Sequence, residues 1–202
     1  MAESAVQALG TPRERTAEAL RQVALIVGAS LFVAVCAHKG SISLMPLTPV
    51  PLTLQNFAVL LVGLLLGSRR GFAALMLYLV EGMSGLPVFN PAGPGGAAQL
   101  FGITGGFLLA FPLVAFVAGY TLERGKKTFA RAAMAGILAE ALLFAGGLAW
   151  LYGFTHSLAK AAYFGLYWFI GAEVIKVMVA AGIASRWRRG STTHVQGGRS
   201  LP

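Results

Sequence analysis

The sequence predicts an all-α membrane protein with six transmembrane helices and both termini in the cytoplasm. Three observations lead to this prediction: a low charge content, six separate apolar runs and an unequal distribution of Lys and Arg. Of the 202 residues, 56% are hydrophobic and 11% are charged, and the mean hydropathy is +0.72. A soluble domain carries about 25% charged residues. The apolar runs are continuous, so helices are expected rather than the alternating strands of a membrane barrel.

Each apolar run is bounded by residues that favour a turn or a loop. Loop 38–52 is rich in proline, loop 87–99 contains three prolines and three glycines, and Ser68–Gly71 has the composition of a short polar turn. Proline and clustered glycine do not continue a helix. The predicted helices span residues 21–37, 53–67, 72–86, 101–121, 132–152 and 161–185.

These runs predict one six-helix transmembrane domain over residues 21–186. Segment 1–20 carries charges but no apolar core, so it is expected to be a cytoplasmic N-terminal segment rather than a cleaved signal peptide. Segment 187–202 is basic and then rich in Gly, Ser and Thr, which predicts a flexible cytoplasmic tail.

The basic residues set the predicted orientation. Thirteen of the sixteen Lys and Arg residues fall on one side of the predicted helices, Lys39 and Lys160 fall on the other, and Lys176 lies within a helix. Because basic loops stay in the cytoplasm, both termini are expected there, which requires an even number of spans. The net charge of +9 is therefore a topology signal and does not indicate nucleic-acid binding. The single cysteine, Cys36, excludes an internal disulfide and offers no metal cluster.

Four ionisable residues fall inside predicted helices: Glu81, Glu140, Glu173 and Lys176. A charge at the centre of a membrane helix costs about 2.5–3.5 kcal/mol, so it needs a structural or functional reason. Glu173 and Lys176 are three residues apart and therefore share one helix face. They form either a self-neutralising ion pair or a polar group that meets a ligand in a cavity. Glu81 and Glu140 are expected to have structural or assembly roles.

The two irregular loops lie on the same predicted side of the bundle. Irregular backbone near membrane depth is tolerated where it is buried or lines a cavity. In loop 87–99, Asn90 and Gln99 each offer an amide donor and acceptor. Loop 38–52, with Pro49 and Pro51, is expected to form a stiff lid over the same end.

Small residues on the first predicted helix suggest a surface for a membrane partner. Ala24 with Gly28, and Ser30 with Ala34, have the small-xxx-small spacing that lets transmembrane helices approach closely. The same spacing is common in ordinary helix packing, so both interpretations remain open.

Several ordered motifs resemble one known family. Residues 49–56 read PVPLTLQN, which resembles the PVPxTLQ signature of the BioY family, the biotin-specific substrate-binding components of energy-coupling-factor transporters. Segment 169–176 reads FIGAEVIK and is similar to the FxPGDxxK segment of that family, with Glu173 at the position of its aspartate. The motifs between them follow in family order, and the resemblance covers about 21–186. They read GLLLGSRRG at 63–71, LYL at 77–79, GLPVF at 85–89, GG at 95–96 and GITGGF at 102–107.

The resemblance implies a six-helix protein of the cytoplasmic membrane that captures biotin from outside the cell. Such a protein joins a transmembrane coupling subunit and two cytoplasmic ATPase subunits, hydrolyses nothing itself and needs no cofactor or metal. It also implies that Glu173 and Lys176 hold the ligand, and the same site is expected to include Gln55, Asn90, Gln99 and Phe107. A different vitamin-like ligand, or a membrane scaffold that binds no small molecule, are the alternatives.

Overall fold

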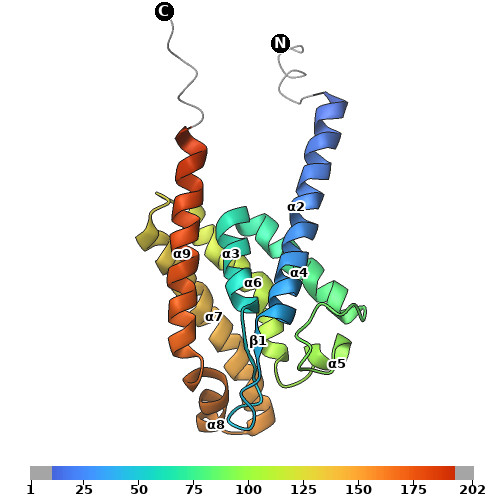
Figure 1. Ribbon diagram of the computed structural model, residues 1–202, viewed down its shortest axis with the longest axis vertical. Helices are drawn as coiled ribbons and strands as arrows, with labels where there is room; N and C mark the ends of the chain where they lie inside the picture. The colour runs from blue at the N-terminus through green and yellow to red at the C-terminus, as the bar shows by residue number, and fades with distance from the viewer. Residues whose placement is uncertain (1–10, 194–202) are drawn as a thin grey trace, which may run out of the picture.

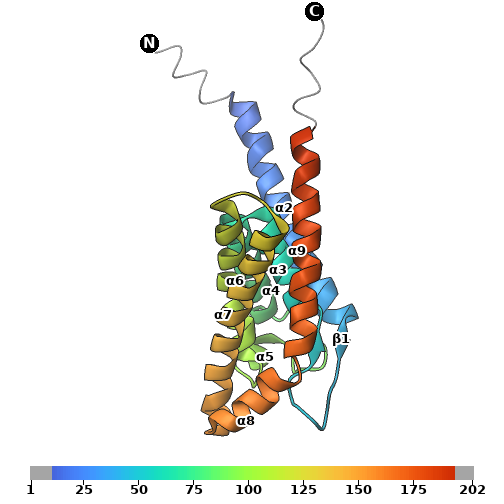
Figure 2. The ribbon, with the colours of Figure 1, turned by 90° about the vertical axis from the view of Figure 1, so that its left-hand side faces the viewer.

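Helices that run alternately between two ends of an elongated bundle make up most of the molecule (Figures 1 and 2). A computed structural model describes the backbone of residues 11–193 and the side chains of residues 11–187. The elements in chain order are α2 (Pro12–Lys39), β1 (Ser41–Ile42), β2 (Leu52–Thr53), α3 (Gln55–Leu66), α4 (Ser68–Met83), α5 (Gly96–Leu100), α6 (Gly105–Glu123), α7 (Phe129–Thr155), α8 (Leu158–Ala162), the π-helix η1 (Tyr163–Tyr167) and α9 (Ile170–Thr193).

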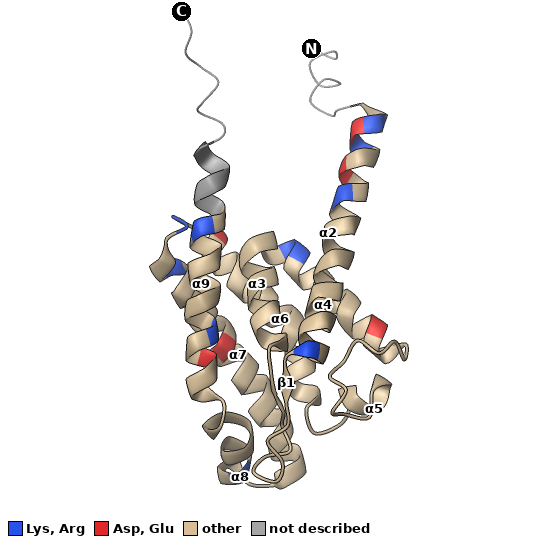
Figure 3. Cartoon of the chain, viewed as in Figure 1, with Lys and Arg blue, Asp and Glu red and all other residues tan. Residues whose placement is uncertain are grey.

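The two ends of the bundle differ in structure and in charge. The Pro12 end of α2 and the Thr193 end of α9 lie together with the α3–α4 and α6–α7 turns, and most Lys and Arg residues gather there (Figures 1 and 3). We call this the basic end. The opposite end, here called the loop end, holds the β1–β2 segment, α5 and α8 (Figure 1).

Three described helices are long and apolar enough to cross a membrane: α2, α6 and α7. The α8–η1 segment and α9 together form a fourth candidate span, which is bent by 45°. Helix α3 is apolar but has only 12 residues, about 18 Å of helix, whereas the hydrocarbon core is about 30 Å thick. The structure thus agrees with a helical membrane protein, while α3 and α4 alone are shorter than a full span.

Helix α2 begins before the predicted boundary at residue 21. Thr11 and Glu14 form a capping box, in which the Thr11 hydroxyl accepts from the Glu14 N–H at 3.3 Å and Glu14 accepts from the Thr11 N–H at 2.7 Å. Pro12 occupies the first helical turn, where its missing N–H costs nothing. Segment 1–20 therefore contributes helix from Pro12 onward, and its first ten residues lie outside the described part.

The turn between α3 and α4 lies at Gly67 and not at the predicted Ser68–Gly71. Gly67 has φ +88°, a conformation that side-chain-bearing residues rarely adopt. Ser68 already belongs to α4, and the Glu123 carboxylate of α6 accepts from its backbone N–H at 2.9 Å and from its hydroxyl at 2.7 Å. This cap comes from another helix, so the local sequence did not indicate it.

We expect Gly67→Ala to destabilise the protein by about 1–3 kcal/mol, the usual cost of a non-glycine residue in a strained backbone conformation. A Cβ at this position would also overlap the Glu123 carboxylate that caps α4. Thermal unfolding in detergent measures the effect. Gly182→Ala is the matched control, because Gly182 lies within α9 and a Cβ there meets no atom within 4 Å. Equal unfolding temperatures for the two variants would contradict the assignment of Gly67 as the turn.

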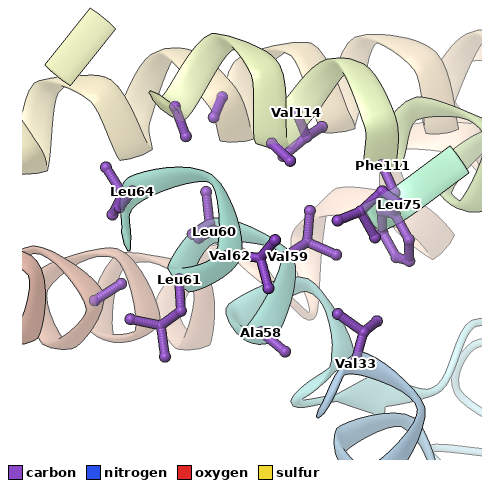
Figure 4. Packing of buried hydrophobic residues seen from close by; sticks show 14 of the residues in the cluster. Val33, Ala58, Val59, Leu60, Leu61, Val62, Leu64, Leu75, Phe111 and Val114 are labelled. Atoms are coloured by element: carbon purple, nitrogen blue, oxygen red, sulfur yellow. The ribbon is translucent and has the colours of Figure 1, made fainter. Parts of the chain in front are cut away.

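The core forms where α3 packs between its neighbours. Leu60, Leu64 and Val59 of α3 point toward α6 and α4, and they pack with Val114 of α6 (Figure 4). A Cβ at Gly63 would overlap the Ala115 carbonyl of α6, so the two backbones approach as closely as small residues permit. This close approach fixes α3, and with it the residues at its N-terminus.

The loop end contains structure that the sequence did not predict. Residues 38–52 were expected to be irregular, but β1 pairs antiparallel with β2, with Ser41 opposite Thr53 and Ile42 opposite Leu52. The expected continuous helix 161–185 is instead broken: η1 ends at Tyr167, and α9 starts at Ile170 after the bend. Short π segments often mark functional sites. Helix α9 then runs to Thr193, past the expected end at residue 185; residues 194–202 of the predicted tail lie outside the described range.

Candidate functional site

A buried polar cluster joins the first turns of α9 and α3. The Lys176 ammonium donates to the Glu173 Oε1 atom at 2.8 Å, to the Asn56 Oδ1 atom at 2.9 Å and to the Thr53 carbonyl oxygen at 2.5 Å. The Asn56 amide also donates to the Glu173 Oε2 atom. Glu173, Lys176 and Asn56 are 6%, 8% and 8% exposed. The predicted Glu173–Lys176 pair is therefore present, inside a closed network.

The chain trace explains why these groups meet. Thr53 is the last residue of β2, so its carbonyl oxygen is not used by a helix. Asn56 is the second residue of α3. Glu173 and Lys176 lie one turn apart on α9, just after the bend. A lysine ammonium has three N–H donors. In this cluster each of them donates to one acceptor: Glu173, Asn56 or the Thr53 carbonyl.

Asn56 is the functional candidate that sequence reasoning missed. It lies in the same PVPLTLQN segment as Gln55, but only Gln55 was included in the expected site. A polar residue at the start of an otherwise apolar, buried helix is the signal that marks it, because a buried amide needs partners. That those partners are the two charges of α9 depends on how α3 and α9 pack.

A cavity with an empty volume of about 600 Å³, its mouth included, lies beside this cluster. Glu173 and Asn56 contribute the polar groups at the cluster, whereas Lys176 is not among the lining residues and lies behind them. Most of the remaining wall is apolar, from the side chains of Val50, Pro51, Phe107, Leu108, Phe111, Leu143, Phe144 and Phe169.

Phe107 is one of the residues that line the cavity, and two glycines make room for its ring. A Cβ on Gly147 of α7 would overlap the ring, and one on Gly165 of η1 would lie 3.3 Å from its tip. Phe144 packs edge-on against the same ring, with centroids 6.5 Å apart and planes at 89°. The ring therefore packs against Gly147, Gly165 and Phe144 and also lines the cavity.

Gln55 also lines the cavity, and its amide is tied to the loop end. The Gln55 amide donates to the Tyr78 hydroxyl at 2.8 Å, and that hydroxyl donates to the Val88 carbonyl at 2.9 Å. Tyr78 is fully buried. This chain of hydrogen bonds fixes the start of loop 87–99 relative to α3 and α4.

Asn90 and Gln99 line the cavity, but their amide groups are largely engaged at the loop end, and Gln99 lies in α5, within the segment that was expected to be an irregular loop. The Gln99 amide donates to the Asn90 carbonyl at 3.1 Å, and its oxygen accepts from the Gly95 N–H at 3.1 Å. The Asn90 amide donates to the Ser41 hydroxyl of β1 at 2.8 Å. These two residues therefore organise the wall and join it to the β1–β2 segment.

The proline-rich segment between β1 and β2 forms part of the cavity wall. Pro51 lines both the main cavity and an adjoining hollow, whereas Pro49 lines the hollow alone. The hollow is bounded on its other side by Gly93 and Pro94 of loop 87–99. The Thr48 hydroxyl donates to the Phe164 carbonyl of η1 at 2.7 Å, which ties this segment to the bend before α9.

The four small residues proposed for docking separate into two environments. Ala24 and Gly28 are exposed and line a shallow apolar groove between α2 and α3. Ser30 and Ala34 are buried, and the Ser30 hydroxyl donates to the Glu81 carboxylate of α4. Ser30 and Ala34 thus lie in internal packing, while Ala24 and Gly28 remain on the surface. Glu81 has a structural partner, as expected.

Comparison with known proteins agrees with this architecture. The structure is similar to the crystal structure titled as the S-component for biotin from an ECF-type ABC transporter, with a TM-score of 0.76 and 23% identity, covering 89% of this chain and 95% of that one. The curated relatives include the "Probable biotin transporter BioY" of Pyrococcus horikoshii, 40% identical over 82% of this chain and 95% of the relative. The "Biotin transporter BioY" of Thermotoga maritima is 38% identical over 81% of this chain and 95% of the relative. The model of the BioY family matches residues 8–193, and the chain therefore belongs to the BioY family.

Proposed function

We propose that this protein binds biotin and acts as the substrate-specific component of an energy-coupling-factor transporter. The observation that carries the proposal is the cavity: a mainly apolar and aromatic chamber whose wall also holds the Glu173 carboxylate and the amide side chains of Gln55, Asn56, Asn90 and Gln99, in a member of the BioY family. The names of the two relatives support the same ligand.

The chemistry of the cavity suits biotin. The ureido ring of biotin carries two N–H donors and one carbonyl acceptor, and the Glu173 carboxylate can accept an N–H with charge-assisted strength. The bicyclic ring and the valeryl chain need apolar walls, which Phe107, Phe144 and Phe169 supply. Lys176 acts through Glu173 and Asn56 in this scheme, since it lies behind both of them.

The proposal includes the position of the chain in the cell membrane. Six helices, α2, α3, α4, α6, α7 and α9, would span or enter the bilayer, with the basic end in the cytoplasm and the cavity mouth outside. The gathering of Lys and Arg at the basic end supports this orientation (Figure 3). A transmembrane coupling subunit and two cytoplasmic ATPases would be the partners and would supply ATP hydrolysis.

The exposed part of the α2–α3 groove is the surface that we assign to the coupling subunit. Ala24 and Gly28 leave a shallow apolar depression there, and small residues allow a partner helix to approach closely.

Equilibrium binding of labelled biotin to the purified protein in detergent tests the proposal. We expect saturable binding and a ligand-dependent rise in unfolding temperature, because a ligand that binds only the folded state stabilises it. Glu173→Ala should abolish both effects, and Gly182→Ala, whose added Cβ would meet no atom within 4 Å, should leave both unchanged. A folded wild type that is stabilised by another vitamin, but not by biotin, would support the other-vitamin alternative. No response to any ligand would support the scaffold.

A further inference from the structure

One buried charged group takes no part in the network described above. Glu140 lies on α7, is 6% exposed, and neither of its carboxylate oxygens has a hydrogen-bond partner among the residues that the structure describes. It is not a lining residue of the main cavity. A carboxylate in this position needs an explanation, because buried polar groups are nearly always paired.

The neighbours of Glu140 come from two helices. Glu173 and Lys176 of α9 are close enough to interact with it electrostatically, and the Asn56 side chain of α3 lies close enough for a weak hydrogen bond outside the ideal geometry. Helix α6, which also packs along α7, carries no Asp, Glu, Lys, Arg or His between Gly105 and Leu122. Lys160 of α8 lies beyond the Thr155 end of α7. Among the described side chains, Lys176 is therefore the cation that interacts with Glu140.

Lys176 has no donor left for Glu140. Its three N–H groups are taken by Glu173, Asn56 and the Thr53 carbonyl, and an ammonium has no fourth. An ionised Glu140 would thus be a second anion beside Glu173 with no cation of its own, in the interior of a membrane protein. A group in that situation takes up a proton and becomes neutral rather than bear the desolvation cost.

We infer that Glu140 carries a proton at neutral pH and acts as a positioning residue, which keeps Glu173 the sole negative charge of the cluster behind the ligand cavity. While Glu140 is neutral, Lys176 stays on Glu173 and Asn56, and Glu173 keeps its place in the cavity wall. Loss of the proton at alkaline pH would give Lys176 a second anion to pair with, and would draw it away from Glu173. The effect on biotin rests on the proposed function; the protonation itself does not.

Infrared spectroscopy of the purified protein tests the protonation without any ligand. We expect the carbonyl stretching band of a protonated carboxylic acid in the wild type, lost in Glu140→Gln and retained in Glu81→Gln. Glu81 is the matched control, since it is also a helix glutamate but is half-buried and bonded to Ser30. The band should also disappear when the wild type is titrated to alkaline pH, which gives the same test without a variant. A wild type that has no such band at neutral pH overturns the inference.

The dependence of biotin affinity on pH tests the positioning role. We expect the wild type to bind biotin more weakly as the pH rises from neutral into the alkaline range. Glu140→Gln mimics the neutral acid, so it should bind as well as the wild type at neutral pH and lose most of the pH dependence. Unchanged pH dependence in Glu140→Gln would overturn the role, because Lys176 or Glu173 would then be the titrating group. If the wild type binds no biotin at any pH, the proposed function fails, while the infrared result still decides the protonation.

Discussion

Replacing Lys176 with methionine is expected to cost the protein both stability and ligand. Methionine keeps much of the length of the side chain but removes the charge that three acceptors share. Breaking a buried ion pair by removing one partner typically costs about 3–5 kcal/mol, because the remaining charge is left unpaired. Loss of one member of a buried charge pair at a binding site weakens binding by about 2–5 kcal/mol, roughly thirtyfold to several thousandfold.

The double variant Glu173→Gln with Lys176→Met separates the two effects. Removing both charges leaves no unpaired ion, so the double variant should regain much of the stability that Lys176→Met loses. It should not regain biotin affinity, because the carboxylate that faces the cavity is gone. Thermal unfolding and equilibrium binding measure the two quantities on the same preparations. If Lys176→Met unfolds at the wild-type temperature and binds biotin normally, the cluster has neither role.

Gly147→Ala is expected to weaken biotin binding by altering the shape of the cavity alone. A Cβ on Gly147 would overlap the Phe107 ring, which Phe144 and Gly165 hold from other sides. Because the ring lines the cavity, a shift that relieves this overlap is expected to change the shape of the cavity. Inserting a methyl group into a packed site costs about 1–3 kcal/mol, which corresponds to roughly a 5-fold to 150-fold loss of affinity if the ring moves into the ligand space.

Gly153→Ala provides the matched control for that experiment. Gly153 lies on the same helix, six residues further on and exposed, and a Cβ there meets no atom within 4 Å. We therefore expect this variant to bind biotin like the wild type. Similar affinities for the two alanine variants would mean that the Phe107 ring does not border the ligand.

Local sequence determined the elements whose signals are contained in a single segment. Helix α7 was predicted over 132–152 and is observed over Phe129–Thr155. The prediction was possible because a long apolar run between a basic turn and a polar turn is sufficient to indicate a helix. The Glu173–Lys176 pair was predicted because three-residue spacing on a helix places two side chains on one face. The basic end followed from counting charges, which requires no knowledge of contacts.

The tertiary structure alone decided the features that depend on segments distant in the chain. Glu123 caps α4 at Ser68, 55 residues away, so the turn falls at Gly67 instead of the polar residues that follow it. Asn56 lies 117 residues from Glu173 and meets it only because close backbone packing against α6 holds α3 in place.

The same distinction applies to the remaining site residues. The sequence showed that Asn90 and Gln99 are polar groups in an irregular loop, but only the fold showed that their amides are engaged in holding that loop. The sequence also showed that Glu140 is a charge in a membrane helix; that no described cation donates to it depends on Lys176 having used its three donors elsewhere. A sequence determines which groups must be satisfied, and the packing of the helices determines which group satisfies which.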